Sequence, residues 1–308
     1  MPDPHPDFAL LGDSWKLALD ADGYSANTIA SYTRAVRTLA EWMATHHEGV
    51  GPAEVQRDHV RGWLVHVRES TSRGSARSLF PGLRHFCRWM VAEGEATRDA
   101  TDGIRTPKAN DTVTNTITAA QIKALLATCT GRDFVSVRDE AIILLFVDGG
   151  LRLAELTGLD AERSVDISAR MLLVEGKGSD RSGPRRRAVP LGVRATRALD
   201  RYLRVRRHHP YADRPQLWLG ARGRATLSMD GVDAMLKRRA VKAGVSGLHP
   251  HAFRHSWASA FRLAGGTEGD LMVLGGWRSR QMLDRYGRTE ASERAQEAYR
   301  KRSFGDRL

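Results

Sequence analysis

The sequence predicts a mainly α-helical chain with a small antiparallel β-sheet, divided into two domains. Three observations predict this fold class. Apolar residues recur at spacings of three and four over most of the 308 residues. Between residues 164 and 191, short β-branched or alternating runs are separated by turn residues instead. Residues 100–118 have almost no periodic apolar content and are rich in Thr, Asn, Asp and Pro, which is typical of a linker.

The N-terminal domain is predicted to be helical and basic. Residues 1–13 are acidic and rich in proline, and we expect a disordered lead there. Residues 25–47 carry one apolar face, Pro52 opens a second helix at the position where proline fits best, and Gly94 closes a third. We therefore assign residues 14–103 to a helical domain.

The second domain, residues 118–308, is predicted to combine helices with the sheet. The linker, residues 104–117, ends where Thr118 and Gln121 form a capping box, so a helix begins at Ala119. A second helix, ending in a glycine pair, precedes the sheet. The predicted strands are residues 164–168, 170–176 and 185–191. The predicted later helices are residues 193–208, 228–243, 251–264, two short pieces within 268–286, and a C-terminal tail helix.

Composition limits the class of partner. Lys and Arg number 48 against 36 Asp and Glu, and this net charge of +12 favours a polyanion such as nucleic acid by counterion release. The alternative to a polyanionic partner is that the surface is rich in arginine only because the overall composition favours arginine.

No apolar run approaches a membrane span and no export signal is visible, so we expect a cytoplasmic protein without a membrane partner. Cys87 and Cys129 lie in apolar helical patterns, which predicts buried free thiols.

Four separate stretches carry residues suited to one reaction. In GGLRLAEL, residues 149–156, Arg152 stands between two helices, where it can project into a cleft. Glu155 can orient a neighbouring side chain or interact with the helix dipole. In the predicted hairpin loop, glycines flank Lys177, which could protonate a leaving oxygen if nearby cations lower its pKa. A solvated basic turn is the alternative for this segment.

The third stretch, residues 248–261, places His251 and Arg254 on one face near a helix start. His255 follows His251 by four residues, a spacing that suits zinc. However, no glutamate follows the first histidine, no third ligand stands out, and an arginine between the histidines is a poor neighbour for a cation. We therefore expect no metal site here.

The fourth stretch is LGGWRSRQMLDRYGR, residues 274–288. On one continuous helix, the nine-residue gap would place Trp277 and Tyr286 on opposite faces. The glycine pair before Trp277 indicates that this tryptophan lies in a turn, and the glycine after Tyr286 indicates the C-terminal end of a short helix. The tyrosine is then either a packing or surface residue, or a nucleophile.

Two arginines, a histidine, a lysine and a terminal tyrosine together suit the transfer of a phosphodiester. Two arginines can neutralise its nonbridging oxygens, and a histidine can share in proton movement. A tyrosine hydroxyl can attack the phosphorus and form a covalent phosphotyrosine, while a lysine protonates the departing 5′ oxygen. This chemistry requires neither a metal nor a cofactor.

In order and spacing, these stretches resemble the tyrosine recombinase (phage integrase) family. The matching elements are GLRLAEL, a lysine on a β-hairpin, H-x-x-R-H, a glycine followed by tryptophan, and a tyrosine nine residues further on. The resemblance implies six catalytic residues: Arg152, Lys177, His251, Arg254, Trp277 and the nucleophile Tyr286. It implies supporting roles for Glu155 and His255. Trp277 stands where the family more often has histidine, and its indole N–H can donate to a phosphate oxygen but cannot shuttle protons.

The resemblance extends over nearly the whole chain. Residues 14–100 resemble the family's core-binding helical domain, as in two-domain members without an arm-binding domain, and the rest resembles its mixed α/β catalytic domain. The implied partners are double-stranded DNA with core-type sites, three further copies in a homotetramer, and an accessory directionality factor, in the cytoplasm and associated with the nucleoid. The implied reaction passes through a 3′-phosphotyrosyl link and a Holliday junction.

The implied biological role is integration or excision of a phage or mobile element. Xer-like resolution of chromosome or plasmid dimers, and relaxation of DNA as by a type IB topoisomerase, are the alternatives. A DNA-binding regulator that has lost catalysis is disfavoured, because all six positions are filled. The tail from residue 289 is expected to pack either on its own domain or on a neighbouring subunit.

Overall fold

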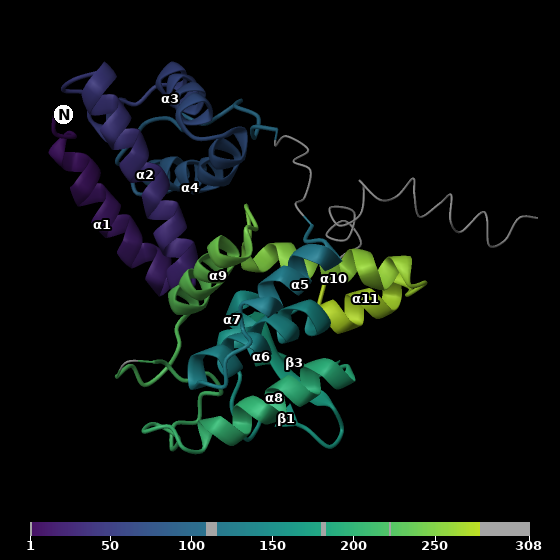
Figure 1. The fold of residues 1–308 in the computed structure, drawn as a ribbon. Helices are drawn as coiled ribbons and strands as arrows, with labels where there is room; N and C mark the ends of the chain where they lie inside the picture. The colour runs from purple at the N-terminus through teal and green to yellow at the C-terminus, as the bar shows by residue number, and fades with distance from the viewer. Residues whose placement is uncertain (1, 109–115, 180–182, 222, 278–308) are drawn as a thin grey trace, which may run out of the picture. The chain divides into compact units, whose positions relative to one another are not determined.

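The computed structural model divides the chain into two compact units, residues 1–112 and 113–308, and the division falls within the predicted linker (Figure 1). The described residues are 2–108, 116–179, 183–221 and 223–277. Each unit has its own hydrophobic core. The predicted fold class, mainly α with a small antiparallel sheet, is confirmed.

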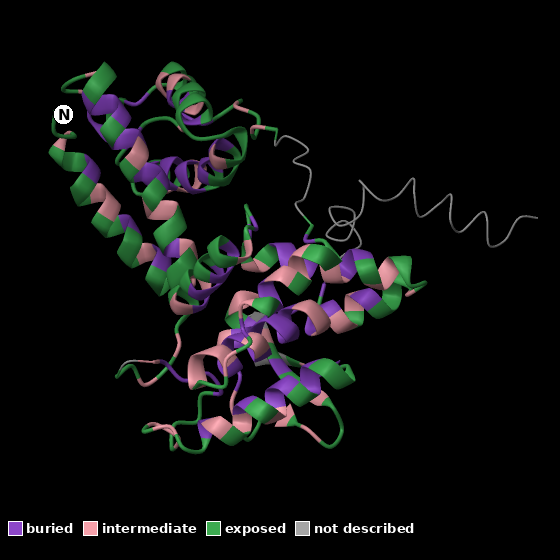
Figure 2. Cartoon of the chain, viewed as in Figure 1, coloured by how far each residue is buried: buried purple, intermediate pink, exposed green. Residues whose placement is uncertain are grey.

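The N-terminal unit is a bundle in which α2 contacts each of the other α-helices. Its described elements are α1 (Pro6–Ala21), α2 (Ala26–His46), the 3-10 turn η1 (Pro52–Glu54), α3 (Arg57–Ser70) and α4 (Arg73–Ala92). The core contains the fully buried rings of Trp15, Trp63 and Phe80. Figure 2 shows the buried residues on the helix faces turned toward this core and the exposed residues on the outer faces.

Helix α1 corrects the prediction of a disordered lead over residues 1–13. The helix begins at Pro6, and buried Phe8, Trp15 and Leu19 form one stripe along it. Pro6 occupies the first helical position, where its missing N–H costs nothing. The proline-rich composition of these residues therefore marks a helix start, and the apolar stripe supplies the packing that holds the helix in place.

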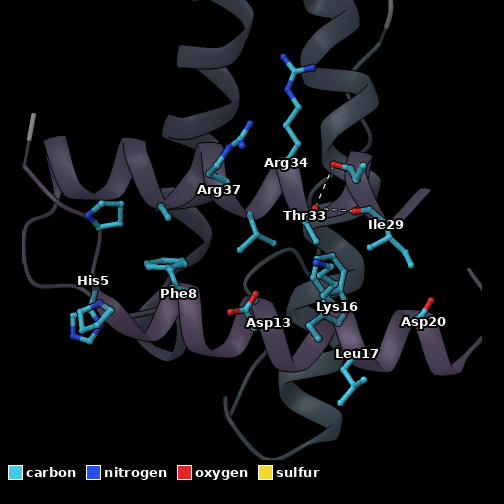
Figure 3. A pocket seen from close by; sticks show the side chains of 18 of the residues that line it. His5, Phe8, Asp13, Lys16, Leu17, Asp20, Ile29, Thr33, Arg34 and Arg37 are labelled. Atoms are coloured by element: carbon cyan, nitrogen blue, oxygen red, sulfur yellow. Dashed lines mark hydrogen bonds between the residues drawn. The ribbon is translucent and has the colours of Figure 1, made fainter. Parts of the chain in front are cut away.

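The surface between α1 and α2 is hollowed by a groove of about 1180 Å³ (Figure 3). Phe8 and Ile29 contribute apolar walls, one from each helix, and the charged side chains of Asp13, Lys16 and Arg34 also line it. One side of the groove is thus built from residues that belong to α1, which makes this helix an integral part of the unit.

The second predicted helix is interrupted near its start. Pro52 opens only the short turn η1, and Val55 and Gln56 then adopt extended backbone before α3 begins at Arg57. Val55 is buried in the core of the unit. The extended pair therefore allows Val55 to reach the core, which explains the break in a segment that reads as one helix.

Positive charge is concentrated in the C-terminal unit. Residues 1–112 contain 13 Lys and Arg against 15 Asp and Glu, whereas residues 113–308 contain 35 against 21. Over the predicted domain itself, residues 14–103, basic and acidic residues number 11 each, so the prediction of a basic N-terminal domain is wrong as a statement about net charge. Within that unit, residues 57–92 of α3 and α4 contain seven arginines against two acidic residues, so its basic surface is local.

The C-terminal unit is organised around α6, which is buried along most of its length. Its described elements are α5 (Ala119–Ala127), α6 (Phe134–Gly149), α7 (Leu153–Thr157), β1 (Val165–Asp166), β2 (Met171–Ser179), β3 (Gly183–Pro190), α8 (Val193–Arg206), α9 (Met229–Ala243), α10 (Pro250–Leu263) and α11 (Glu268–Gly275). Helix α6 contacts α8 on one side and α10 on the other (Figure 1). Helix α5 begins with the predicted Thr118–Gln121 capping box.

The three strands pair antiparallel, as predicted, and their order in the sheet is β1-β2-β3. Val174 of β2 faces Arg187 of β3, and Glu175 faces Arg186. Side chains alternate along a strand, so Arg187 shares the face of buried Val189. Arg186 lies on the opposite, solvent-exposed face and donates to Glu175 at 2.8 Å.

Lys177 lies within β2 rather than in the predicted hairpin loop. The strand continues to Ser179, which pairs with Gly183, and the register between β2 and β3 shifts between Gly176 and Ser179. Pairing of the flanking backbone thus carries the strand past the glycines that suggested a loop.

Two further expectations concern burial. Cys87 and Cys129 are both buried free thiols, as predicted. Burial raises the pKa of Cys87 to about 12, so this thiol is unreactive at neutral pH. No helix in the described part of the chain is long and apolar enough to cross a membrane.

We predict that Gly82→Ala destabilises the N-terminal unit, because a Cβ at Gly82 would lie 2.8 Å from the Cα of Tyr32 where α4 packs against α2. Overpacking costs about 1–3 kcal/mol, against a gain of about 1 kcal/mol in helix propensity. Gly12→Ala in α1 is the matched control, since a Cβ there meets nothing within 4 Å, and it should raise the melting temperature. Calorimetry of the full chain measures both. A gain in stability for Gly82→Ala would contradict the close approach of the helices.

Candidate active site

Arg152 is held at the junction between α6 and α7. Gly150, with a left-handed φ of 55°, ends α6, and Arg152 is the N-cap of α7. The backbone N–H of Arg152 donates to Oε2 of Glu155 at 2.8 Å, and its guanidinium Nη1 donates to Oε1 at 2.6 Å. Glu155 therefore both stabilises the start of α7 and fixes the side chain of Arg152.

A second arginine, Arg187 of β3, binds the same carboxylate. Its Nη1 and Nη2 donate to the two oxygens of Glu155 at 2.9 and 2.8 Å, and its Nε donates to the carbonyl of Leu274 at 2.8 Å. The side chain of Glu155 is only 4% exposed. Burial raises the pKa of Glu155, but the hydrogen bonds and charges of Arg187 and Arg152 outweigh it and lower the pKa to about 2. The carboxylate therefore stays ionised.

The C-terminal carbonyls of α11 hold the two candidate catalytic arginines. Gly276, with a left-handed φ of 64°, ends this helix. Arg254 donates through Nη2 to the carbonyl of Gly275 and through Nη1 to that of Gly150 at 2.7 Å. Arg152 donates through Nη2 to the carbonyl of Gly276 at 3.3 Å. Cations are favoured at a helix C-terminus, and here adjacent carbonyls bring Arg152 and Arg254 to one place.

Trp277 lies in the turn after α11, as predicted, and its ring is buried. The guanidinium carbon of Arg254 lies 4.0 Å from the centre of this ring, a cation–π contact. The ring also stacks on Trp257 of α10, with centroids 6.0 Å apart. Trp257 packs against Gly150, where any Cβ would overlap it. The tryptophan therefore has a packing role, and its role as a phosphate donor stays a prediction.

The histidines of α10 are electrically neutral at physiological pH. The rings of His251 and His255 meet nearly perpendicular, with centroids 4.5 Å apart. Burial lowers the pKa of both groups. The nearby charge of Arg254 lowers the pKa of His251 further, and interactions with His251 and His249 help to lower the pKa of His255 to about 3. A neutral imidazole can accept or donate a proton, which suits His251 to proton transfer.

Among the described residues, no group of three or more His, Cys, Asp or Glu could hold a metal.

The structure thus places six of the eight predicted site residues in three contacting pairs: Arg152 with Glu155, Arg254 with Trp277, and His251 with His255. The first two pairs are joined through the adjacent carbonyls of Gly275 and Gly276. His251 and His255 lie on the same helix as Arg254. The backbone of Lys177 lies in β2, but its side chain is outside the described residues, as is the whole of Tyr286. The roles of all eight residues therefore remain predictions.

Sequence reasoning missed Arg187, although the sequence contains a signal for it. In the strand RRRAVPL, Arg187 has the two-residue period of Val189, an apolar residue that faces the core. An arginine on the inner face of a strand needs a buried acidic or carbonyl partner. That requirement points to a partner such as Glu155.

Comparisons with known proteins agree with this geometry. Residues 115–293 match the Phage integrase family, and residues 13–94 match the phage integrase N-terminal SAM-like domain. The chain belongs to the phage integrase family. It is therefore a tyrosine recombinase, an enzyme that cuts and rejoins DNA strands at specific sites.

Two kinds of relative accompany this match. A tyrosine recombinase XerC of Ralstonia pickettii (strain 12J) is 33% identical over 275 residues, which cover 83% of this chain and 81% of the relative. The integrase of transposon Tn1549, in complex with a circular intermediate DNA, superimposes with a TM-score of 0.72 at 18% identity, covering 94% of this chain and 99% of that one. Lambda integrase (residues 75–356) bound to DNA gives 0.68 at 18%, covering 92% and 97%. At these identities the two structures establish the shared fold of this recombinase.

We predict that Glu155 contributes stability that depends on pH. Its folded pKa of about 2 lies below its usual value of 4.5, so the contribution, ~3 kcal/mol, is complete above pH 4.5 and is lost as the pH falls toward 2. The difference in unfolding free energy between the natural protein and Glu155→Gln should therefore narrow by about 1–2 kcal/mol between pH 6 and pH 3.

Urea unfolding at a series of pH values measures this difference. Glu175→Gln is the matched control, because it removes the same charge from a half-exposed surface pair with Arg186, and such pairs contribute little to stability. A difference for Glu155→Gln that stays constant down to pH 3 would contradict the ionised, doubly paired carboxylate.

Proposed function

We propose that this cluster of arginines binds the scissile DNA phosphate for attack by Tyr286. The observation that carries the proposal is the anchoring of Arg152 and Arg254 on the adjacent carbonyls of Gly275 and Gly276. Arginine forks placed in this way can bind the nonbridging oxygens of one phosphodiester. The site contains three positive charges, on Arg152, Arg187 and Arg254. Only one negative charge, on Glu155, opposes them.

The proposed reaction uses only side chains of the chain. The hydroxyl oxygen of Tyr286 attacks the phosphorus and loses its proton, with His251 sharing in that transfer. The bond from phosphorus to the 5′ oxygen breaks, and Lys177 donates a proton to the leaving oxygen. The product is a 3′-phosphotyrosyl link and a free 5′ hydroxyl. Attack of a 5′ hydroxyl from the partner duplex reverses the step, so bond energy is kept and strands exchange through a Holliday junction.

The proposed complex is a homotetramer on two core-type DNA sites, in the cytoplasm and at the nucleoid. Support for DNA as the partner comes from the charge of residues 113–308, with 35 basic against 21 acidic residues. The local basic surface of α3 and α4 supports phosphate contacts from the N-terminal unit as well. An accessory factor that sets the direction of exchange belongs to the same proposal.

Two biological roles are compatible with this chemistry. Integration or excision of a phage or mobile element is the role inferred from the sequence. A Xer-like role in resolving chromosome or plasmid dimers is favoured by the identity of 33% to a tyrosine recombinase XerC over 83% of the chain. Mapping the DNA bound by the protein in cells separates the roles, since an attachment site bordering a mobile element supports the first and one chromosomal site supports the second.

We predict that Tyr286→Phe retains DNA binding but forms no covalent adduct, because only the hydroxyl is removed. A binding site is first selected from a library of random duplexes and then built into a nicked suicide duplex. The natural protein should become trapped on this duplex as a species that survives denaturing electrophoresis. The phenylalanine variant should bind with the same affinity and yield no adduct. Trapping of the variant would overturn the assignment of the nucleophile.

We also predict transfer of strands between two separate sites. Recombination joins the 5′ end of one duplex to the phosphotyrosyl link on another, whereas relaxation rejoins the same strand. Two duplexes of different length, both carrying the selected site, should therefore yield recombinant products of intermediate length with the natural protein. Relaxation of supercoiled DNA without recombinants would instead support the topoisomerase-like alternative.

A further inference from the structure

We propose that Arg187 is a positioning residue for DNA strand cleavage: it holds Glu155 so that Arg152 remains available to the phosphate. This inference rests on the proposed function of the site and adds a residue to it. No catalytic role was predicted for Arg187 from the sequence, and its side chain is only 12% exposed. All three of its guanidinium nitrogens already donate to Glu155 or to the carbonyl of Leu274, so Arg187 acts through these neighbours rather than by touching DNA.

The geometry gives Arg187 three bonds, each to a different acceptor atom. Two of its nitrogens bind the oxygens of Glu155, and its Nε binds the carbonyl of Leu274. The first two bonds connect β3 to α7, and the third connects β3 to the last turn of α11. Arg152 and Arg254 are anchored on the two carbonyls that follow Leu274. Arg187 therefore fixes both the carboxylate that orients Arg152 and the helix end that receives both arginines.

Electrostatics gives the same residue a second effect. Glu155 divides its single negative charge between two guanidinium groups. Without Arg187, the whole carboxylate charge would face Arg152 alone and pair with it one to one. The net charge of the three arginines and Glu155 would then fall from +2 to +1. Attack on a phosphodiester builds up a second negative charge on the phosphoryl oxygens, so this loss weakens binding of the transition state more than binding of DNA.

Arg186, the preceding residue of β3, provides a matched control. It carries the same charge and belongs to the same strand, but its side chain lies on the opposite face and is 64% exposed in a pair with Glu175. Removing the charge of Arg186 should therefore change the general attraction for DNA as much as removing that of Arg187. It leaves Glu155 and α11 untouched.

The experiment compares Arg187→Gln with Arg186→Gln in the full chain. The probe is the nicked suicide duplex built on the selected binding site, and single-turnover adduct formation is measured with saturating protein, below the melting temperature of each variant. We expect Arg187→Gln to form the adduct at least about tenfold more slowly, with an affinity for intact duplex within about twofold of that of Arg186→Gln. Arg186→Gln should form the adduct at nearly the natural rate.

Two further variants separate positioning from loss of structure. Arg187→Lys keeps the charge but carries its donors on one nitrogen, so it cannot reproduce the planar fork to Glu155 together with the separate Nε bond to Leu274, and it should recover part of the lost rate. Combining Arg187→Gln with Glu155→Gln should be no more than about threefold slower than the slower single variant, because both remove one connected unit. If Arg187→Gln does not fold, Arg187→Lys carries the test and should be at least about threefold slower than the natural protein.

The inference is overturned if Arg187→Gln, or Arg187→Lys where that variant carries the test, cleaves as fast as Arg186→Gln. Independent, multiplying effects of the Arg187 and Glu155 substitutions would overturn it too. If the natural protein forms no adduct at all, the proposed function itself fails and the inference fails with it. The natural protein thus reports on the function, and the ratio between the two arginine variants reports on this inference.

Discussion

The buried carboxylate of Glu155 is the constraint on which the arrangement of the site depends. An ionised carboxylate with 4% exposure is tolerated only if donors surround it. Arg152 and Arg187 supply four hydrogen bonds, and they come from the start of α7 and from β3. Helix, strand and junction must therefore meet at one point for the charge to be buried. The same hydrogen bonds therefore hold the site together and join α7 to β3.

The end of α11 provides the other half of the arrangement. A helix leaves its last carbonyls without partners in its own turn, and these point along the axis away from the helix. Gly276 ends α11 in a left-handed conformation and leaves such acceptors for Arg152, Arg187 and Arg254. Carbonyl groups carry no net charge, so these contacts position arginines without neutralising them. That property suits a site whose substrate is an anion.

Sequence periodicity predicted most of the fold because amphipathic helices and alternating strands are local patterns. The Thr118–Gln121 capping box and the glycine pair that ends α6 were recognised for the same reason. Two predictions in the N-terminal unit were wrong because the local structure there depends on tertiary packing. The acidic, proline-rich composition of residues 1–13 suggested disorder, although Phe8 and Trp15 form the apolar stripe by which α1 packs. The extended backbone at Val55 follows from the burial of its side chain.

The residues of the site fall into the same two groups, those that local sequence patterns predict and those that only tertiary contacts reveal. Arg152, Glu155 and Arg254 lie in motifs with recognisable spacing, whereas Arg187 lies in a run of three arginines whose members look alike. Only pairing with β2 distinguishes the inner Arg187 from the outer Arg186. The net charge was predicted correctly for the chain but assigned too evenly, because residues 113–308 carry a net charge of +14 and residues 1–112 carry −2. Attraction for phosphate is therefore concentrated in the unit that holds Arg152 and Arg254. The N-terminal unit has little net charge and contributes through the local basic surface of α3 and α4.

General affinity for DNA and stabilisation of the cleavage step thus depend on charges in the same unit. For this reason, a substitution at the site must be compared with a control substitution that changes charge alone, such as that of Arg186.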